Sequence, residues 1–224
     1  MPDAREIHEE RSVDTVAAGR RVAAAMEGAR DLLDEHYRWC DLKYSGAHNE
    51  HGIEARKRLT QLIWVLRRVT DLHQEASDLF TETFPWEMAD RERHKIWQEK
   101  RDRGDFDAAT RKQMEVSDEI ELLAEMFYYA AFRAQSIFSK RLPGLSGFDA
   151  TGVRIVRNHL IEHPEGRSSG VVANGFGYGM PRGPVLKAVR DSEQSAIHPD
   201  AGLFNNAAEF AEILVRKIRA ALAA

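Results

Sequence analysis

The sequence predicts a mainly α-helical fold, a multi-helix bundle of long antiparallel helices with a small β-hairpin excursion near 170–190. Apolar residues recur at steps of three and four over long stretches, the pattern of helices that bury one face. Short breaks rich in glycine, proline and polar residues separate these stretches, and short links favour antiparallel neighbours. No internal repeat is found, so residues 1–224 are expected to form a single domain.

The first predicted helix is capped by Ser12 or Asp14 and carries its apolar face from Val13 to Tyr44. The break SGAHNEHG at 45–52 follows it. A second helix repeats the pattern from Leu59 to His73, and we expect it to run back beside the first.

The stretch at about 85–112 is dense in charges of both signs, and it predicts a solvated helical excursion. A third helix near 110–140 carries a broad apolar stripe and ends at the breaker LPGLSG. Further along, the glycine-rich segment 168–190 contains two β-prone pieces, which we expect to form a hairpin across one end of the bundle.

Two shorter helices complete the expected bundle. One begins at Asp149 or Thr151, and Pro164 ends it because proline cannot continue the helical hydrogen-bond ladder. The other is predicted to begin at a capping box formed by Asn206 and Glu209 and to run to the end of the sequence.

Composition restricts the cellular setting. The single cysteine, Cys40, excludes an intrachain disulfide, and the charged N-terminus lacks the apolar core of a signal peptide. The longest apolar runs are far shorter than a membrane span. We therefore expect a cytoplasmic protein with no membrane contact. The net charge of −4 hides a local basic excess, because six basic residues oppose two acidic ones between Arg154 and Arg190, a balance of +4.

Three motifs that suggest chemistry have simpler interpretations. The glycines between 175 and 183 do not match a phosphate-binding loop, since no GxxxxGK[ST] and no following helix is present. His48 and His51 lack a third metal ligand, and Cys40 lies on an apolar stripe. We expect no cofactor and no bound metal.

The segment VRIVRNHLIEHPEG at 153–166 is the strongest candidate site. On a helix, Val153, Val156 and Leu160 form the buried stripe, while Arg157 and His163 lie at its opposite edges. An arginine beside an apolar stripe needs a carboxylate, a partner surface or a phosphate. His163 lies at the helix C-terminus, where the helix dipole favours the imidazolium and suits general acid–base chemistry.

Arg157-Asn158 followed by His163 resembles the arginine, polar residue and histidine signature of the HEPN family of helical-bundle proteins. Similar arginine–histidine spacings occur elsewhere, as in Arg68/His73, but only the Arg157/His163 pair has both the asparagine and the helix end. The resemblance implies a dimer. It also implies a metal-independent ribonuclease of toxin–antitoxin or phage-defence systems, although some family members only bind.

For RNA cleavage, Arg157 would bind the phosphate, His163 would transfer protons and Asn158 would orient either group. Arg154, His159 and Arg167 are candidate substrate contacts. One helix offers an arginine and a histidine about 9 Å apart, so a complete site is expected where two such helices face each other in a homodimer.

The expected partners are RNA, a second copy of the chain, and an antitoxin or other protein. The alternative is a non-enzymatic helical interaction or nucleic-acid-binding module that uses the same helix as a dimer or partner surface. In that case Arg157 pairs with a glutamate of a neighbouring helix, and His163-Pro164 is a helix stop whose imidazole caps free carbonyl groups.

Overall fold

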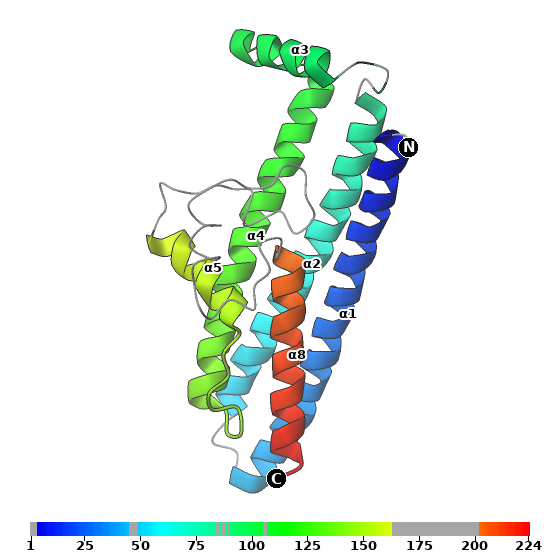
Figure 1. Ribbon diagram of the computed structural model, residues 1–224. Helices are drawn as coiled ribbons and strands as arrows, with labels where there is room; N and C mark the ends of the chain where they lie inside the picture. The colour runs from blue at the N-terminus through cyan, green and yellow to red at the C-terminus, as the bar shows by residue number, and fades with distance from the viewer. Residues whose placement is uncertain are drawn as a thin grey trace.

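The computed structural model describes residues 4–44, 49–83, 86, 88, 90–104, 107–162 and 202–224. Its helices are long and lie nearly side by side (Figure 1). The chain runs down α1, up α2 and down α4, and the final helix α8 runs down again beside α1. The predicted mainly α-helical bundle is therefore confirmed.

Helix α1 spans Ala4–Tyr44 and α2 spans Asn49–Thr83, so both are longer than the apolar stripes indicated. The predicted cap at Ser12 or Asp14 is wrong, because the helix begins at Ala4. Its first turns are rich in good helix formers and contain an ion pair between Arg5 and Glu9, 3.0 Å from Nε to Oε1.

The charged stretch forms a helix, as predicted. Helix α3 spans Asp90–Arg103 and lies across the upper end of α4 (Figure 1). Among its described charged residues, Glu99 is paired within the helix with Lys95 and Arg103. Helix α4 spans Ala108–Arg141, and its N-cap is Asp107, whose Oδ1 accepts a hydrogen bond from the Thr110 amide at 2.8 Å.

The breaker LPGLSG ends α4 in two turns that fold back onto the bundle. Gly144 and Gly147 both have positive φ, 76° and 71°, which other residues adopt at a cost. Leu142 and Leu145 of this segment are buried. Helix α5 follows at Thr151–Glu162, which confirms one of the two predicted starting residues.

Helix α8 spans Leu203–Leu222, and its N-cap is Gly202, which makes no side-chain cap hydrogen bond. The predicted capping box is therefore wrong. Asn206 lies inside the helix and is buried, with 1% of its surface exposed, and its amide donates to Tyr128 Oη at 2.9 Å. Tertiary contacts satisfy the polar groups that the sequence pattern assigned to a cap.

The hydrophobic core runs along the contacts of α1, α2, α4 and α8. Near the lower end, Phe138, Phe148 and Phe210 come from α4, the following turns and α8, with ring centroids 5.2–6.1 Å apart. Other fully buried side chains along the bundle are Met26, Leu33, Leu59, Leu62, Leu66, Leu72 and Phe127.

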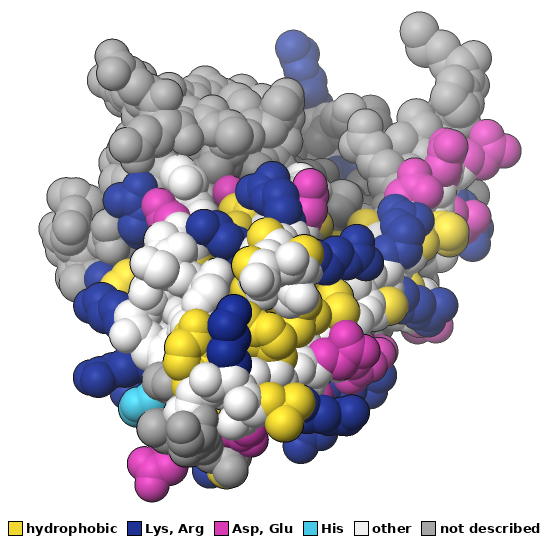
Figure 2. Space-filling model, turned by 90° about the horizontal axis from the view of Figure 1, so that it is seen from below, with side chains coloured by type: hydrophobic (Ala, Val, Ile, Leu, Met, Phe, Trp, Pro, Cys, Tyr) yellow, Lys and Arg dark blue, Asp and Glu magenta, His cyan; other side chains and the backbone are white. Residues whose placement is uncertain are grey.

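The lower end of the bundle, where α1 meets α2 and the chain ends, is rich in basic side chains. Figure 2 shows lysines and arginines around a hydrophobic area on this face. Exposed basic residues from three helices contribute, namely Arg38, Lys43, Lys57, Lys140 and Arg141. The chain is negative overall, so charge is unevenly distributed along the bundle.

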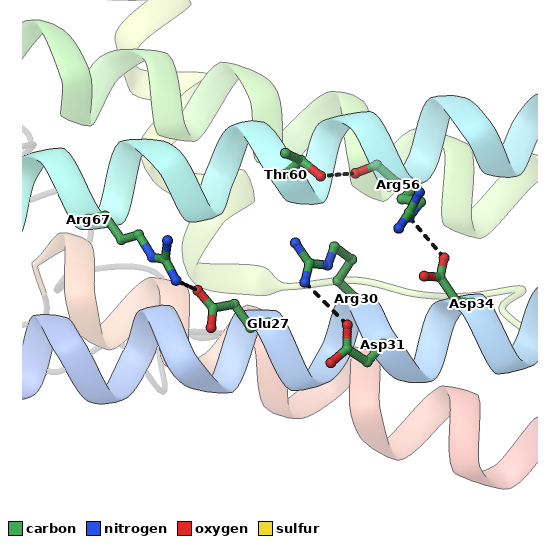
Figure 3. A network of polar contacts seen from close by, with 7 residues as sticks. All are labelled: Glu27, Arg30, Asp31, Asp34, Arg56, Thr60 and Arg67. Atoms are coloured by element: carbon green, nitrogen blue, oxygen red, sulfur yellow. Dashed lines mark hydrogen bonds and ion pairs between the residues drawn. The ribbon is translucent and has the colours of Figure 1, made fainter.

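Polar contacts fix the antiparallel pairing of α1 and α2 (Figure 3). Glu27 pairs with Arg67, and Asp34 Oδ1 lies 3.1 Å from Arg56 Nε. The later residue on α1, Asp34, pairs with the earlier residue on α2, Arg56. The two helices therefore run antiparallel, as predicted. Exposed pairs of this kind contribute about 0–1 kcal/mol each, so they align the helices more than they stabilise them.

The described residues contain no strand. The predicted hairpin at 168–190 lies outside them, as does Pro164. Among the described helices, none is both long enough and apolar enough to cross a membrane.

Candidate functional site

Side chains from two other helices hold the start of α5. The amide of Ala150 donates to Gln135 Oε1 at 3.2 Å, and Gln135 Nε2 donates to Asp149 Oδ1 at 2.9 Å. The amide of Gly152 donates to Glu209 Oε2 of α8 at 3.2 Å. Amides at a helix start have no partner within the helix, so these bonds fix both the start and the position of α5.

Gly152 allows α8 to approach this closely. A Cβ atom at this position would lie 2.5 Å from both Asn206 Oδ1 and Glu209 Oε2, too close for any carbon–oxygen contact. The sequence thus uses a glycine inside α5 for close packing.

Burial raises the pKa of Glu209, and the hydrogen bond from Gly152 partly opposes this shift. The nearby acidic residues Asp149 and Glu212 raise the pKa further. A carboxylate at a helix N-terminus is favoured by the helix dipole. Glu209 therefore acts as an anchor for α5, supplied by a distant part of the chain.

The buried stripe predicted for α5 is confirmed where it is described. Val153 and Val156 are buried, with at most 2% of their surfaces exposed. Between them Arg154 is half-buried, and Arg157 follows one turn later, also half-buried. Both arginines thus lie at the border between the core and solvent, a position that the spacing predicted for Arg157.

Each arginine has a defined contact. Arg154 Nε lies 3.3 Å from Asp149 Oδ1. The guanidinium carbon of Arg157 lies 4.0 Å from the centre of the Phe132 ring on α4. Residues three apart on a helix are neighbours, so α5 presents two guanidinium groups on adjacent turns. Such a pair can bind the oxygens of a phosphate or a carboxylate.

The other predicted site residues are not positioned by the structure. Asn158 and His159 belong to α5, but their side chains are not among the described ones. His163 and Arg167 lie outside the described residues. Their approach to Arg157 stays a prediction.

The sequence did not predict the contributions of Phe132 and Gln135 to this region, nor the anchoring role of Glu209. All three come from helices other than α5. The α4 stripe shows which residues are apolar, but no local signal shows which of them face α5. Asp149 was recognised, although only as a helix cap.

Among the other sequence candidates, His48 and the glycines between 175 and 183 lie outside the described residues, whereas Cys40 is described and structural. Cys40 is fully buried, and its Sγ lies 3.4 Å from Nε2 of buried His36. Burial raises the pKa of Cys40 to about 11 and lowers that of His36, so both are neutral near pH 7. Cys40 therefore behaves as the small hydrophobe that its position predicts. The predicted break at 45–52 is too long, because α2 begins at Asn49. His51 therefore lies in the first turn of a helix.

No group of three potential metal-binding side chains comes together within the described part of the chain. No family model, curated protein or solved structure matches the chain. The resemblance to HEPN proteins thus rests on Arg157-Asn158 and His163 alone.

Proposed function

We propose that the chain is a HEPN-like, metal-independent endoribonuclease whose site is built on α5. The observation that carries the proposal is the placement of Arg154 and Arg157 on adjacent turns of a helix whose start is fixed by Gln135 and Glu209. Catalytic groups must be held in a defined position, and a helix fixed in this way can hold them. The motif residues Asn158 and His163 continue from the same helix.

The reaction needs no group beyond the chain and the RNA. The 2′-oxygen attacks the neighbouring phosphorus, and the bond from phosphorus to the 5′-oxygen breaks. A base takes the proton of the 2′-hydroxyl, and an acid gives a proton to the leaving 5′-oxygen. The products are a 2′,3′-cyclic phosphate and a 5′-hydroxyl. In this proposal His163 transfers protons, and Arg157 stabilises the charge that grows on the phosphate oxygens.

The contact between Arg157 and Phe132 is compatible with this role. Stacking on an aromatic ring uses the flat face of the guanidinium, whereas phosphate is bound through N–H groups at its edge. The ring fixes the plane of the guanidinium before the substrate arrives. We assign Asn158 to orienting Arg157 or the phosphate, and Arg154, His159 and Arg167 to contacts along the RNA backbone.

The proposed partners follow from the resemblance: RNA, a second copy of the chain, and a protein antitoxin. The basic balance from Arg154 to Arg190 favours a polyanionic substrate, because each neutralised phosphate releases counterions. Binding should therefore weaken as the salt concentration rises.

The test is incubation of the full chain with structured RNA in EDTA, followed by analysis of the product ends. We expect cleavage that leaves 2′,3′-cyclic phosphates. Loss of general acid–base catalysis in His163→Ala should slow cleavage by about 100-fold or more. Arg157→Ala should cause a comparable loss, and Arg157→Lys should restore little because lysine cannot bind bidentately.

Arg21→Ala is the matched control, since it removes one exposed arginine from α1, away from α5. It should cleave at the wild-type rate. If His163→Ala cleaves as fast as the wild type, the assignment of His163 is wrong.

A second candidate is a non-enzymatic interaction module. The observation in its favour is that the described contacts of Arg154 and Arg157, to Asp149 and Phe132, are within the chain. Such contacts also stabilise an ordinary packed helix. RNA binding without cleavage by the wild-type chain would favour this candidate over the ribonuclease.

A further inference from the structure

The outer face of α2 and α4 carries exposed apolar side chains that neither helix buries. Trp64 on α2 is 55% exposed, and Leu122, Met126 and Tyr129 on α4 are 60%, 36% and 39% exposed. We call these four residues the α2–α4 patch. Single exposed apolar residues are ordinary, but several on adjoining helices indicate an interaction surface.

Two ion pairs fix the relative register of these helices. Arg68 Nε lies 2.8 Å from Glu119 Oε1, and Glu75 Oε1 lies 3.3 Å from Lys112 Nζ. From Arg68 to Glu75 the chain advances seven residues along α2, and the paired position on α4 moves from Glu119 back to Lys112, also seven residues. Trp64 precedes Arg68 by four residues, so it lies level with the position four residues after Glu119, which is position 123. The indole is therefore level with the space between Leu122 and Met126, and the patch is continuous across the two helices.

The spacing on α4 is that of a helix–helix seam. Leu122, Met126 and Tyr129 follow one another at steps of four and three, and Glu119 and Arg133 extend the same row at either end. Side chains in such a row lie on one side of a helix and fit between those of a facing helix. Within the described residues, no other element covers this row.

The ionisable groups along the outer edges of α2 and α4 change sign from one end of the patch to the other. On the α3 side of the patch, seven acidic groups oppose three basic ones, a balance of −4. They are Arg68, Asp71, Glu75, Asp78 and Glu82 on α2 and Arg111, Lys112, Glu115, Asp118 and Glu119 on α4.

On the opposite side, at the lower end shown in Figure 2, five basic groups oppose two acidic ones, a balance of +3. They are Glu50, Glu54, Lys57 and Arg58 on α2 and Arg133, Lys140 and Arg141 on α4. One face therefore has an acidic end, an apolar centre and a basic end.

We propose that the α2–α4 patch is a homodimer interface in which a second copy of this chain packs antiparallel on the same face. A two-fold axis near the level of Leu122 and Met126 makes the surface complementary to itself, since the acidic end of each copy meets the basic end of the other. Arg133 of one copy then lies near the level of Glu115 and Asp118 of the other. A parallel arrangement would instead place like charges together.

This interface is not built from α5. Arg157 on α5 contacts Phe132, which does not belong to the row of residues from Glu119 to Arg133 that forms the seam. In the antiparallel dimer the two Arg157 side chains lie at opposite ends of the interface. The proposal therefore does not depend on the ribonuclease site, and the pairing does not by itself join two α5 helices.

The test is sedimentation velocity of the full chain over a concentration series. The wild type should be a dimer, and Leu122→Glu should raise the dimer dissociation constant by about 100-fold or more, because a carboxylate is poorly solvated in an apolar seam. Leu42→Glu is the matched control, since Leu42 on α1 is 89% exposed but lies away from the patch. It should remain dimeric.

The antiparallel register has its own test. Arg133→Glu should weaken the dimer, and the double variant Arg133→Glu with Asp118→Arg should restore it. Circular dichroism verifies that each variant keeps the helical fold. A monomeric wild type, or a dimer unaffected by Leu122→Glu, would overturn the proposal. His163→Ala should remain dimeric even if it abolishes RNA cleavage, so the two proposals fail separately.

Discussion

At the scale of single residues, the same residue type takes different roles according to burial. Sequence periodicity placed His73 on the apolar stripe of the second helix, and the structure confirms this placement. Its ring lies 5.8 Å from that of Phe204, and burial lowers its pKa to about 4. A histidine held neutral in this way packs at the edge of the core and is not a proton-transfer group near pH 7.

The lowered pKa of His73 predicts acid sensitivity. Below pH 6.5 the unfolded chain takes up a proton that folded His73 does not, so the free energy of unfolding falls between about pH 6.5 and 4, by up to about 3 kcal/mol. Chemical denaturation of the wild type and His73→Leu across this range measures the effect. The variant should lose less stability on acidification, and parallel curves for the two proteins would contradict the prediction.

At the scale of helices, a glycine inside a helix can mark a close contact rather than a break. The sequence placed Gly52 in a chain break, but it lies within α2 and is buried. A Cβ atom there would overlap Tyr37 Oη of α1, at 0.5 Å. Gly28 in α1 is different, because a Cβ atom would meet nothing within 4 Å.

These two glycines should respond oppositely to the same substitution. Gly28→Ala should raise the free energy of unfolding by about 1 kcal/mol, since alanine favours the helix. Gly52→Ala should lower it by about 1–3 kcal/mol, because Tyr37 must move away. Denaturant titration measures both. In a Tyr37→Ala background the penalty at position 52 should disappear, and its persistence would mean that another contact is responsible.

At the scale of the whole molecule, contacts between distant segments determine where α5 lies. The hydrogen bond from Gly152 to Glu209 spans 57 residues of sequence, and that between Asn206 and Tyr128 spans 78. Both link the final helix to parts of the chain that precede it. The candidate site thus depends on the return of α8 to the bundle.

Glu209→Ala should therefore loosen α5 selectively. The loss of a helix-capping carboxylate costs about 1 kcal/mol, so amides in the first turn of α5 should exchange with solvent faster by up to about fivefold. Hydrogen exchange followed by mass spectrometry can measure this, with α1 as the internal reference. Arg216→Ala, which removes an exposed side chain from the same helix, is the control and should leave the exchange of α5 unchanged. Equal acceleration throughout the molecule would instead indicate a general loss of stability.

The sequence predicted the elements better than their ends. Apolar periodicity located each long helix, but α1 extends to Ala4 although no stripe supports its first turns and Val13 is 67% exposed. Helix propensity and local ion pairs sustain such turns without burial. The capping box failed for the opposite reason, since Asn206 and Glu209 fit a local motif but form tertiary hydrogen bonds.

The sequence by itself determined where the long helices lie and which face of each is apolar, because both follow from interactions within a few turns. It also singled out Arg157, at the border of a buried stripe. Only the tertiary structure decided which helix covers each stripe, that Phe132 contacts Arg157, and that Trp64 and Leu122 stay uncovered. Hydrophobic burial has no directional preference, so an apolar stripe needs a partner without specifying which one, and packing of the whole chain selects it.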